Sequence, residues 1–370
     1  MKAVAVFPAP QEVKVVEQEF PRLAQPDQVT LRMLDIGICG TDKEICSFEY
    51  GTPPRGDDHL VIGHESLAEV MDVGTAVERL APGDLVVPSV RRPCPHPGSL
   101  ACRSGHQDYC YTGDFSERGI KEAHGYMAEY VVDHEQYMNV VAPHLRDIAV
   151  LAEPLTIAEK ALAQIAWMMQ QRSPWINPET PSEERGRGLS ALVLGIGPVG
   201  VLGAMVLVTA GFTTYVYSRE LPPSPRIDLV ESIGATYVSS QSATFGQLVE
   251  QIGNIDLIYE AVGHSHFALE ALKVLGTNGI FVLTGVPGLQ AFVETDPAHQ
   301  MREMVLKNQA LLGTVNAGPD AFASALRDLD RFRRRWPVVV PTLIAGRYPP
   351  EQAPDLILGR PAGIKSVIAF

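Results

Sequence analysis

Hydrophobic residues in the first 150 positions occur in short runs separated by polar residues and Gly/Pro turns such as Ala81-Pro82-Gly83. Runs of this length that are mostly rich in β-branched residues are typical of β-strands. We expect strands at Val13–Val16, Val29–Leu34, Leu67–Val73, Asp84–Val87 and Tyr126–Val132. Two long polar insertions, Gly51–His59 and Arg91–Phe115, separate some of these strands, and loops of this length are usually functional.

The pattern changes near Pro154, where an apolar-rich helix is expected over Leu155–Met169, followed by a polar connector, Ser173–Gly188. Short apolar runs then alternate with helical segments, which predicts a parallel, doubly wound sheet. The expected strands are Ala191–Leu194, Tyr215–Tyr217, Leu257–Tyr259, Ile280–Leu283 and Leu311–Val315, and the expected helices are Val199–Ala210, Ile227–Ile233 and His266–Val274. A helix at Asp320–Phe332 and a strand at Ile364–Phe370 are expected in the remainder.

A chain of 370 residues is long for one hydrophobic core, so two domains are expected. The 43 acidic residues exceed the 30 basic ones, and the resulting net charge of −13 disfavours nucleic acids and anionic membranes as partners. The uncharged stretch Ala191–Phe212 is long enough to span a bilayer. It contains Pro198 and five glycines, however, and divides into a strand, a turn and a helix, so we expect a globular enzyme with small-molecule partners.

All five cysteines lie in the first third of the chain, at positions 39, 46, 94, 102 and 110. The N-terminus lacks the apolar segment of a secretory signal. An odd number of cysteines near His and Glu therefore favours metal ligation in the cytoplasm over disulfides.

A glycine-rich turn, Gly195-Ile196-Gly197-Pro198-Val199-Gly200, joins a predicted strand to a predicted helix. In that context Gly195 permits a tight turn, Gly197 lets the backbone approach a pyrophosphate and Gly200 allows close packing. With the following Pro198 and Val199, the turn would bind a dinucleotide at the helix N-terminus. The alternative is a structural turn without a ligand.

The end of the next strand bears on the choice of dinucleotide. An NAD site needs an acidic residue there, whereas this chain has Ser218 followed by Arg219. A guanidinium suits the 2′-phosphate of NADP. The neighbouring Glu220 would weaken such a pocket, so NADP is favoured and NAD remains an alternative.

Four residues from three segments could hold a catalytic zinc ion: Cys39, His64, Glu65 and Glu153. Catalytic zinc takes three ligands of these types and keeps one position open. Singly, each residue has an ordinary alternative, as a buried thiol, a turn histidine or a surface acid. Their combination is what indicates metal chemistry.

With these motifs the chain resembles the zinc-dependent medium-chain dehydrogenase/reductase superfamily, and within it the glucose dehydrogenase branch. The resemblance rests on Gly37–Asp42, Gly63–Glu65, Arg91-Arg92, Glu117–Ile120, His124–Met127, Ala152–Leu155, the glycine turn and Gly313–Asn316. It implies an α/β architecture, with a GroES-like β-rich catalytic domain of residues 1–157 and 317–370. A Rossmann NADP-binding domain of residues 158–316 would complete the chain.

The resemblance also implies roles for individual residues. Zinc would be held by Cys39, His64 and Glu153, with Glu65 as an alternative ligand, and Glu65 and Glu153 would also line the substrate side of the metal. Thr41 would hydrogen-bond the reacting hydroxyl and pass its proton toward Glu44. Sugar hydroxyls would be held by Glu117 and Asn316, and Asn316 would also contact the cofactor. Two departures weaken the sugar assignment: Val90 replaces an asparagine, and Leu306 replaces a histidine, of some members.

The superfamily also has a structural zinc loop of the form C-x2-C-x2-C-x7-C. Cys102 and Cys110 fit its last pair, but the earlier positions hold Ser99 and His96, and Cys94 lies two residues before His96. Either zinc is held by Cys94, Cys102, Cys110 and His96 (or His106), or this metal has been lost.

The function implied is oxidation of an aldose, D-glucose to gluconolactone, with NADP or NAD as hydride acceptor. The alternatives are a polyol or threonine dehydrogenase of the same superfamily, a metal-free reductase, and a non-catalytic nucleotide-binding protein. The resemblance also implies a cytoplasmic homodimer or homotetramer, assembled through the sheet edge near Leu311–Val315.

Overall fold

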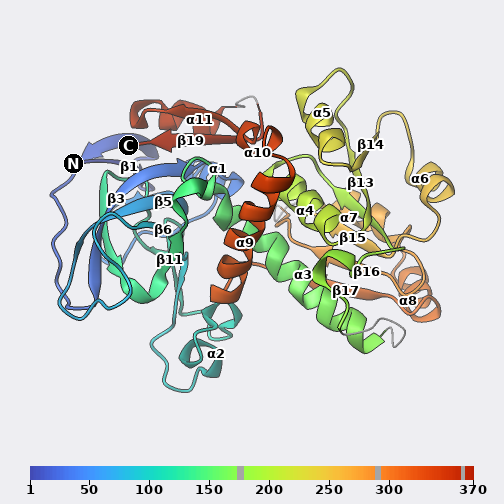
Figure 1. Cartoon of the computed structure of the whole chain (residues 1–370), viewed down its shortest axis with the longest axis horizontal. Helices are drawn as coiled ribbons and strands as arrows, with labels where there is room; N and C mark the ends of the chain where they lie inside the picture. Colours follow the sequence, from blue (N-terminus) through green and yellow to red (C-terminus); the bar gives the residue numbers. More distant parts are fainter. Residues whose placement is uncertain (173–178, 288–292, 360–362) are drawn as a thin grey trace. The chain divides into compact units, whose positions relative to one another are not determined.

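The computed structural model describes residues 1–172, 179–287, 293–359 and 363–370 (Figure 1). The chain forms two compact units, one of Met1–Thr156 with Asn316–Phe370 and the other of Ile157–Val315. The first residues of the predicted connector Ser173–Gly188, positions 173–178, lie outside the described residues.

The first unit is built mainly of antiparallel strands in three sheets. A seven-stranded sheet has the order β11-β6-β5-β3-β19-β18, with β10 also paired to β3. The other two have the orders β2-β1-β4 and β7-β8-β9. The strands are β1 (Lys2–Phe7), β2 (Glu12–Glu17), β3 (Gln28–Gly37), β4 (Leu60–Val61), β5 (Glu65–Val73), β6 (Leu85–Pro88), β7 (Arg91–Arg92), β8 (Ser116–Arg118), β9 (Glu122–Ala123), β10 (Tyr130–His134), β11 (Met138–Val141), β18 (Ile344–Tyr348) and β19 (Lys365–Ala369).

Helices of this unit lie around these sheets. They are α1 (Gly40–Cys46), α2 (Leu100–Arg103), α9 (Pro319–Arg335), α10 (Val339–Thr342) and α11 (Ala353–Leu358), together with the start of α3 (Ala152–Arg172) and the 3₁₀ turns η1 (Gln107–Tyr109), η2 (Glu135–Tyr137), η3 (Pro143–Leu145), η4 (Ala149–Leu151) and η6 (Pro350–Gln352). One hydrophobic core spans the first two of these sheets, because buried residues of β1, β3, β5 and β6 belong to the same cluster.

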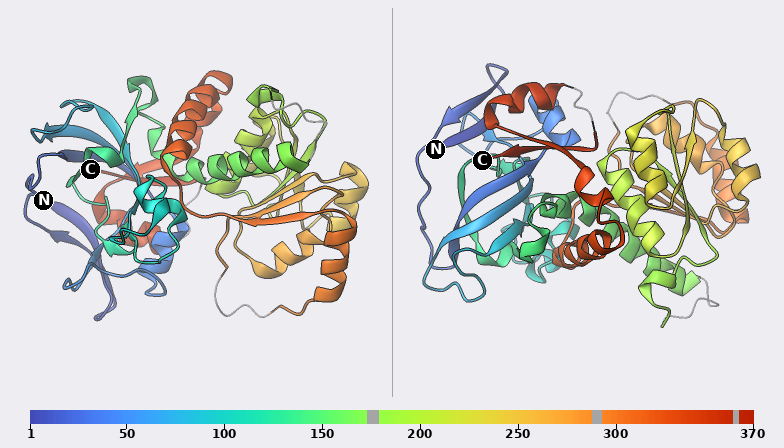
Figure 2. Two further views of the ribbon diagram at one scale, coloured as in Figure 1. Left: turned by 90° about the horizontal axis from the view of Figure 1, so that it is seen from below. Right: turned by 45° about the horizontal axis from the view of Figure 1, so that its top comes forward.

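The second unit is a six-stranded parallel sheet with the order β14-β13-β12-β15-β16-β17. Helices cover both of its faces (Figure 2). Its elements are the body of α3, η5 (Ser182–Glu184), β12 (Ser190–Leu194), α4 (Pro198–Thr209), β13 (Thr213–Ser218), α5 (Pro225–Ser232), β14 (Thr236–Ser239), α6 (Phe245–Ile252), β15 (Leu257–Glu260), α7 (Ser265–Leu272), β16 (Ile280–Leu283), α8 (Pro297–Leu306) and β17 (Ala310–Gly313). The predicted doubly wound parallel sheet is confirmed.

Most of the strands and helices expected from the sequence are confirmed within a few residues. The strand expected at Tyr126–Val132 is wrong in its first half, since β10 begins only at Tyr130. Residues 126–128 pair with β1 and with the segment after β4 through single backbone hydrogen bonds and one isolated bridge, Ala3 with Ala128, so they do not form a continuous strand. The Tyr126 side chain is fully buried, and its hydroxyl donates to Ser89 O and contacts Asp133. The strand β1 at Lys2–Phe7 and the helix α1 at Gly40–Cys46 were not predicted from the sequence.

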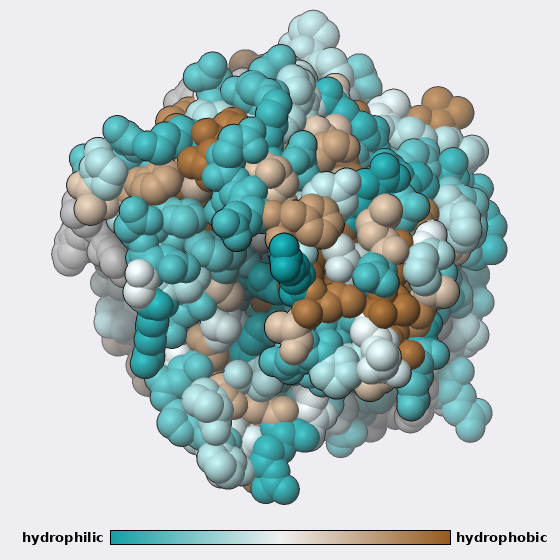
Figure 3. Space-filling model, turned by 90° about the vertical axis from the view of Figure 1, so that its left-hand side faces the viewer, coloured by the Kyte–Doolittle hydropathy of each residue, from teal (hydrophilic) through white to brown (hydrophobic). Residues whose placement is uncertain are grey.

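The apolar stretch Ala191–Phe212 divides into strand and helix as expected, and residues 200–209 of α4 are buried. In the part of the chain that the structure describes, none of the helices has the length and apolar character needed to cross a membrane. The face shown in Figure 3 is mostly hydrophilic, with a smaller hydrophobic area.

Candidate active site

The best candidate for a metal site lies in the first unit, where β3 and β5 pair in antiparallel register with Gly37 opposite Glu65. This register brings Cys39, just after β3, against His64, just before β5. The thiol of Cys39, a ring nitrogen of His64 and a carboxylate oxygen of Glu65 all lie within 4.8 Å of one another. Three residues predicted from separate motifs are thus brought together.

Asp42 links the backbone of Cys39 to the imidazole of His64. Its Oδ2 accepts a hydrogen bond from the backbone N–H of Cys39 at 2.8 Å, which caps the start of α1, and its Oδ1 lies 3.5 Å from His64 Nδ1. Burial alone would lower the pKa of His64, but the Asp42 carboxylate outweighs it and holds that pKa well above the usual value. Asp42 therefore orients the ring and leaves Nε2 as the ligand atom.

Glu65 is paired with a lysine from the other end of the chain. Lys365, on β19, donates to Glu65 Oε1 and Oε2 at 2.7 and 2.5 Å and to Ile38 O at 3.0 Å. Both side chains are buried. A Cβ atom at Gly37 would lie 2.2 Å from Glu65 Oε2, so glycine is needed there to leave room for the carboxylate.

Glu153, the second residue of α3, was predicted as a ligand but is not one of the three residues whose donor atoms lie within 4.8 Å of one another. Its side chain is partly exposed, yet the surrounding protein removes enough water from the carboxyl to raise its pKa to about 7. The charge of His64 opposes this rise and that of Glu65 adds to it, so all three groups share one electrostatic environment. A carboxyl in such a position is stabilised as an anion by a bound cation.

The residues fit a zinc ion. A thiol, an imidazole and carboxylates form the donor set of catalytic zinc. His64 Nδ1 and Asp42 Oδ1, which lie 3.5 Å apart, face each other and so leave Nε2 free to bind a metal ion. The arrangement thus has the chemistry of a metal centre rather than of a hydrogen-bonded core.

Thr41 and Glu44 lie on α1 beside this cluster. The hydroxyl of Thr41 is 3.9 Å from the Cys39 sulfur, and the side chain is half-buried. Glu44 is exposed one turn further along the helix, and partial desolvation and then the charge of Glu49 raise its pKa.

The two residues predicted to hold sugar hydroxyls are in direct contact. Asn316 Nδ2 donates to Glu117 Oε1 at 2.7 Å. Arg91 donates to the same oxygen from Nε at 3.1 Å and Nη2 at 3.0 Å. Val90 and Leu306 are the two positions at which this chain differs from some members of the family that it resembles. Val90, next to Arg91 in the sequence, is buried, whereas Leu306, in the second unit, is exposed.

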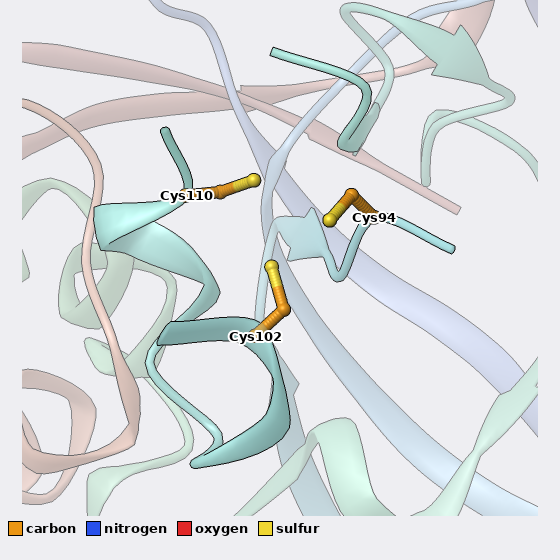
Figure 4. A group of neighbouring side chains, drawn as sticks. All are labelled: Cys94, Cys102 and Cys110. Carbon is orange, nitrogen blue, oxygen red and sulfur yellow. The ribbon is translucent and has the colours of Figure 1, made fainter. Parts of the chain in front are cut away.

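The three cysteines of the insertion also come together. The sulfurs of Cys94, Cys102 and Cys110 lie within 4.8 Å of one another and point toward a common centre (Figure 4). Hydrogen bonding by Thr112 lowers the pKa of Cys94 to about 6, which favours a thiolate. The other two predicted donors lie elsewhere: His96 is paired with Asp114, and His106 is exposed.

The glycine turn of the second unit has the geometry of a nucleotide site. Gly195 has a φ of +105°, and a Cβ atom at Gly200 would lie 2.3 Å from Gly195 O. A Cβ atom at Gly197 would meet no atom within 4 Å, so the space above the turn is open. Pro198 and Val199 form the first turn of α4, whose free N–H groups suit a phosphate.

Ser218 is buried at the end of β13, where its hydroxyl contacts Tyr237 at 2.9 Å. The side chain of Arg219 is exposed. Ser224, the N-cap of α5, donates a hydrogen bond to the carboxylate of Glu220 at 2.7 Å.

Comparison with known proteins places this geometry in a family. Residues 146–370 match the family model "Glucose dehydrogenase C-terminus", and residues 25–143 match "Alcohol dehydrogenase GroES-like domain". The chain belongs to the glucose dehydrogenase family. It is therefore an oxidoreductase of the zinc-containing medium-chain dehydrogenase/reductase superfamily, with the GroES-like and Rossmann folds that the sequence predicted.

Individual relatives of this glucose dehydrogenase family member span its length. It is 35% identical to the glucose 1-dehydrogenase of Methanocella arvoryzae, over 100% of this chain and 99% of the relative. The glucose 1-dehydrogenase of Thermoproteus tenax is 38% identical over 89% and 88% of the two chains. The structure of Haloferax mediterranei glucose dehydrogenase in complex with NADP, Zn and gluconolactone is similar, with a TM-score of 0.85, 33% identity and coverage of 100% and 99%.

Three polar residues of the site were not predicted from the sequence. They are Asp42, Lys365 and Arg91, the last as a hydrogen-bond donor to Glu117. Asp42 stands three residues after Cys39, a spacing that suits a helix-capping acid and could have been noticed. Arg91 was recorded only as part of a motif. Lys365 had no local signal, because its partner is 300 residues away.

Proposed function

We propose that this family member is a zinc-dependent glucose 1-dehydrogenase that oxidises D-glucose to gluconolactone with NADP as hydride acceptor. The observation that carries the proposal is the convergence of Cys39, His64 and Glu65 in a family whose Haloferax mediterranei member was solved with NADP, Zn and gluconolactone.

Cys39, His64 and Glu153 would hold the zinc. Both carboxylate oxygens of Glu65 accept hydrogen bonds from Lys365, so Glu65 would be an alternative ligand to Glu153. When bound, zinc supplies Lewis acidity that lowers the pKa of the sugar's C1 hydroxyl, and NADP accepts the hydride.

The chain's own residues handle the proton. Thr41 Oγ1, close to the Cys39 sulfur, accepts a hydrogen bond from the C1 hydroxyl and relays its proton outward. Glu44, exposed and with a raised pKa, is a suitable acceptor on the solvent side. With NADP as the hydride acceptor, the products would be gluconolactone, NADPH and one proton, and Thr41 and Glu44 would carry that proton away.

Glu117 and Asn316 orient the sugar. Their contact at 2.7 Å fixes a carboxylate and an amide together, and this pair can accept from and donate to vicinal hydroxyls. Arg219, with Ser218 in place of an acidic residue, favours the 2′-phosphate of NADP over the free hydroxyl of NAD. NAD use at lower efficiency is compatible with this arrangement.

The cysteine cluster is proposed as a second, structural zinc site on Cys94, Cys102 and Cys110. His96 would have to exchange its contact with Asp114 for the metal to serve as the fourth ligand. The unpaired state of all five thiols supports a reducing compartment, the cytoplasm. A homodimer or homotetramer is proposed along β17, an edge strand on which Leu311 is exposed.

The test is a matrix of steady-state rates on protein of measured zinc content, with D-glucose, other aldoses, sorbitol and threonine against NADP and NAD. The proposal expects the highest kcat/KM for D-glucose with NADP. A higher kcat/KM for sorbitol or threonine would reassign the substrate, and turnover that is independent of zinc would indicate a metal-free reductase.

A further inference from the structure

Arg91 and Glu117 face each other across the short antiparallel pair of β7 and β8. Both side chains are buried. Three N–H donors converge on Glu117 Oε1: two from Arg91 and one from Asn316. Among the described residues none donates to Oε2, so this oxygen is the one left for a ligand hydroxyl.

The same guanidinium is fixed to the cysteine insertion. Arg91 Nη1 donates to the main-chain oxygen of Asp108 at 3.2 Å, and Gln107 Nε2 donates to the main-chain oxygen of Arg91 at 3.3 Å. Gln107 and Asp108 belong to η1, which lies between Cys102 and Cys110. The ring of Phe115 lies 3.8 Å below the guanidinium. Arg91 is thus held on one side by the insertion and on the other by Glu117.

The insertion also contacts the segment that carries Asn316. A Cβ atom at Gly318 would lie 2.8 Å from Oδ1 of Asp108, so the Asp108 carboxylate occupies the space that a side chain there would need. Gly318 is two residues beyond Asn316 and caps α9. Asp108 therefore supports both donors of Glu117, one through its main-chain oxygen and the other through its side chain.

The cysteines determine whether η1 can keep this position. Residues 93–115 leave β7 and return to β8, and the helical part of this loop consists only of the short α2 and η1. Such short helices are not stable by themselves. The cluster of Cys94, Cys102 and Cys110 brings the start, middle and end of the loop within 4.8 Å of one another, on either side of η1.

We propose that Arg91 is a positioning residue that couples the folded state of the three-cysteine loop to the orientation of Glu117, and thereby sets affinity and selectivity for the sugar. This inference rests on the proposed function. It assigns the loop, some distance along the chain from the metal ligands, a role in substrate recognition and not only in stability.

Arg91 would act by helping to occupy Glu117 Oε1 fully with hydrogen-bond donors. With Oε1 bound to three donors, the Glu117 carboxylate has one orientation, and Oε2 presents a fixed acceptor. Without Arg91 the buried carboxylate loses its counter-ion and two of its three donors, so its orientation is no longer fixed and the charge-assisted bond to the sugar is lost. Such a bond corresponds to about tenfold or more in KM. A contact that is equally strong in the ground state and the transition state affects KM and not kcat, and this is the pattern that we expect here.

The experiment compares Arg91→Met, Arg91→Lys, Cys102→Ser and Glu117→Gln with the wild type, using D-glucose and its monodeoxy analogues with NADP. We expect Arg91→Met to raise KM for glucose about tenfold and to lose discrimination against the same deoxy analogue as Glu117→Gln. Arg91→Lys keeps the positive charge but cannot donate two parallel hydrogen bonds, so its KM should lie between those of the wild type and Arg91→Met. The single variant Cys102→Ser should have a higher KM for glucose than the wild type. The double variant Cys102→Ser with Glu117→Gln should have the same KM as Glu117→Gln alone.

The matched control is Arg347→Met. Arg347 also pairs with a buried carboxylate, Asp35, and with a main-chain oxygen, that of Asp147, but does not contact Glu117. It should lower the melting temperature and leave the deoxy-sugar profile unchanged. If the Arg91 variants, including the milder Arg91→Lys, and Cys102→Ser behave like this control, the inference is overturned. A wild type that does not oxidise glucose would refute the proposed function instead.

Discussion

Lys365 donates hydrogen bonds to both carboxylate oxygens of Glu65, and this ion pair is buried beside the proposed zinc ligands. Removing one member of a buried pair leaves an unpaired charge, which costs about 3–5 kcal/mol. We therefore expect Lys365→Met to lower the free energy of unfolding of the metal-free protein by about that amount. Urea denaturation measures it, and the double variant Lys365→Met with Glu65→Gln should recover most of the loss. A single variant as stable as the wild type would contradict the pairing.

Glu153 should make the metal-free protein less stable at high pH. Its folded-state pKa of about 7 lies above the ordinary value of 4.5, so the stabilising effect of its proton is present below 4.5 and is lost as the pH rises through 7. We expect metal-free Glu153→Gln to be more stable than the wild type at pH 8 and similar to it near pH 4.5. Chemical unfolding after chelation tests this, and an unchanged difference between the two pH values would refute it.

Asp133 should have the opposite pH dependence. Burial would raise its pKa, but Arg118 and Arg92 together outweigh burial and lower it below the usual 3.8. The stabilisation of the folded state by the Asp133 carboxylate is therefore fully present above pH 3.8 and is lost as the pH falls through the folded-state pKa. Asp133→Asn should cost about 3–5 kcal/mol at pH 7, and the difference from the wild type should shrink below pH 3.8. A constant difference across that range would exclude this ionic origin.

Arg219 should determine the cofactor preference. A guanidinium–phosphate contact is a charge-assisted bond of about 1.5–3 kcal/mol. Arg219→Ala should therefore raise KM for NADP about tenfold or more and leave KM for NAD almost unchanged. Steady-state kinetics with both cofactors check this. An equal loss with NADP and NAD would mean that Arg219 does not contact the 2′-phosphate.

Local patterns were sufficient to predict much of the fold. Continuous apolar runs identify β12, β15 and β16, and the glycine turn identifies the start of α4. The sequence analysis gave no elements to the stretches that form β14, α6 and α8. The apolar pattern around Tyr126 predicts a strand, but the backbone there makes only scattered hydrogen bonds and one isolated bridge, and β10 begins at Tyr130.

The site was predictable only where a residue lies in a motif. Cys39, His64 and Glu65 were named from short motifs, and the register of β3 with β5 brings them together. The Lys365–Glu65 pair could not be found in this way, because it depends on β19 pairing with β3 across the whole chain. Likewise, the spacing of the cysteines did not reveal that their loop contacts Arg91.

The central claim is that a thiolate and an imidazole hold a zinc ion required for sugar oxidation. The most direct measurement is glucose-dependent NADPH formation by wild type, Cys39→Ala and His64→Ala, with zinc content and NADP binding determined on the same samples. The account predicts that both variants lose zinc and nearly all turnover while NADP still binds. Normal rates in either zinc-free variant would contradict it.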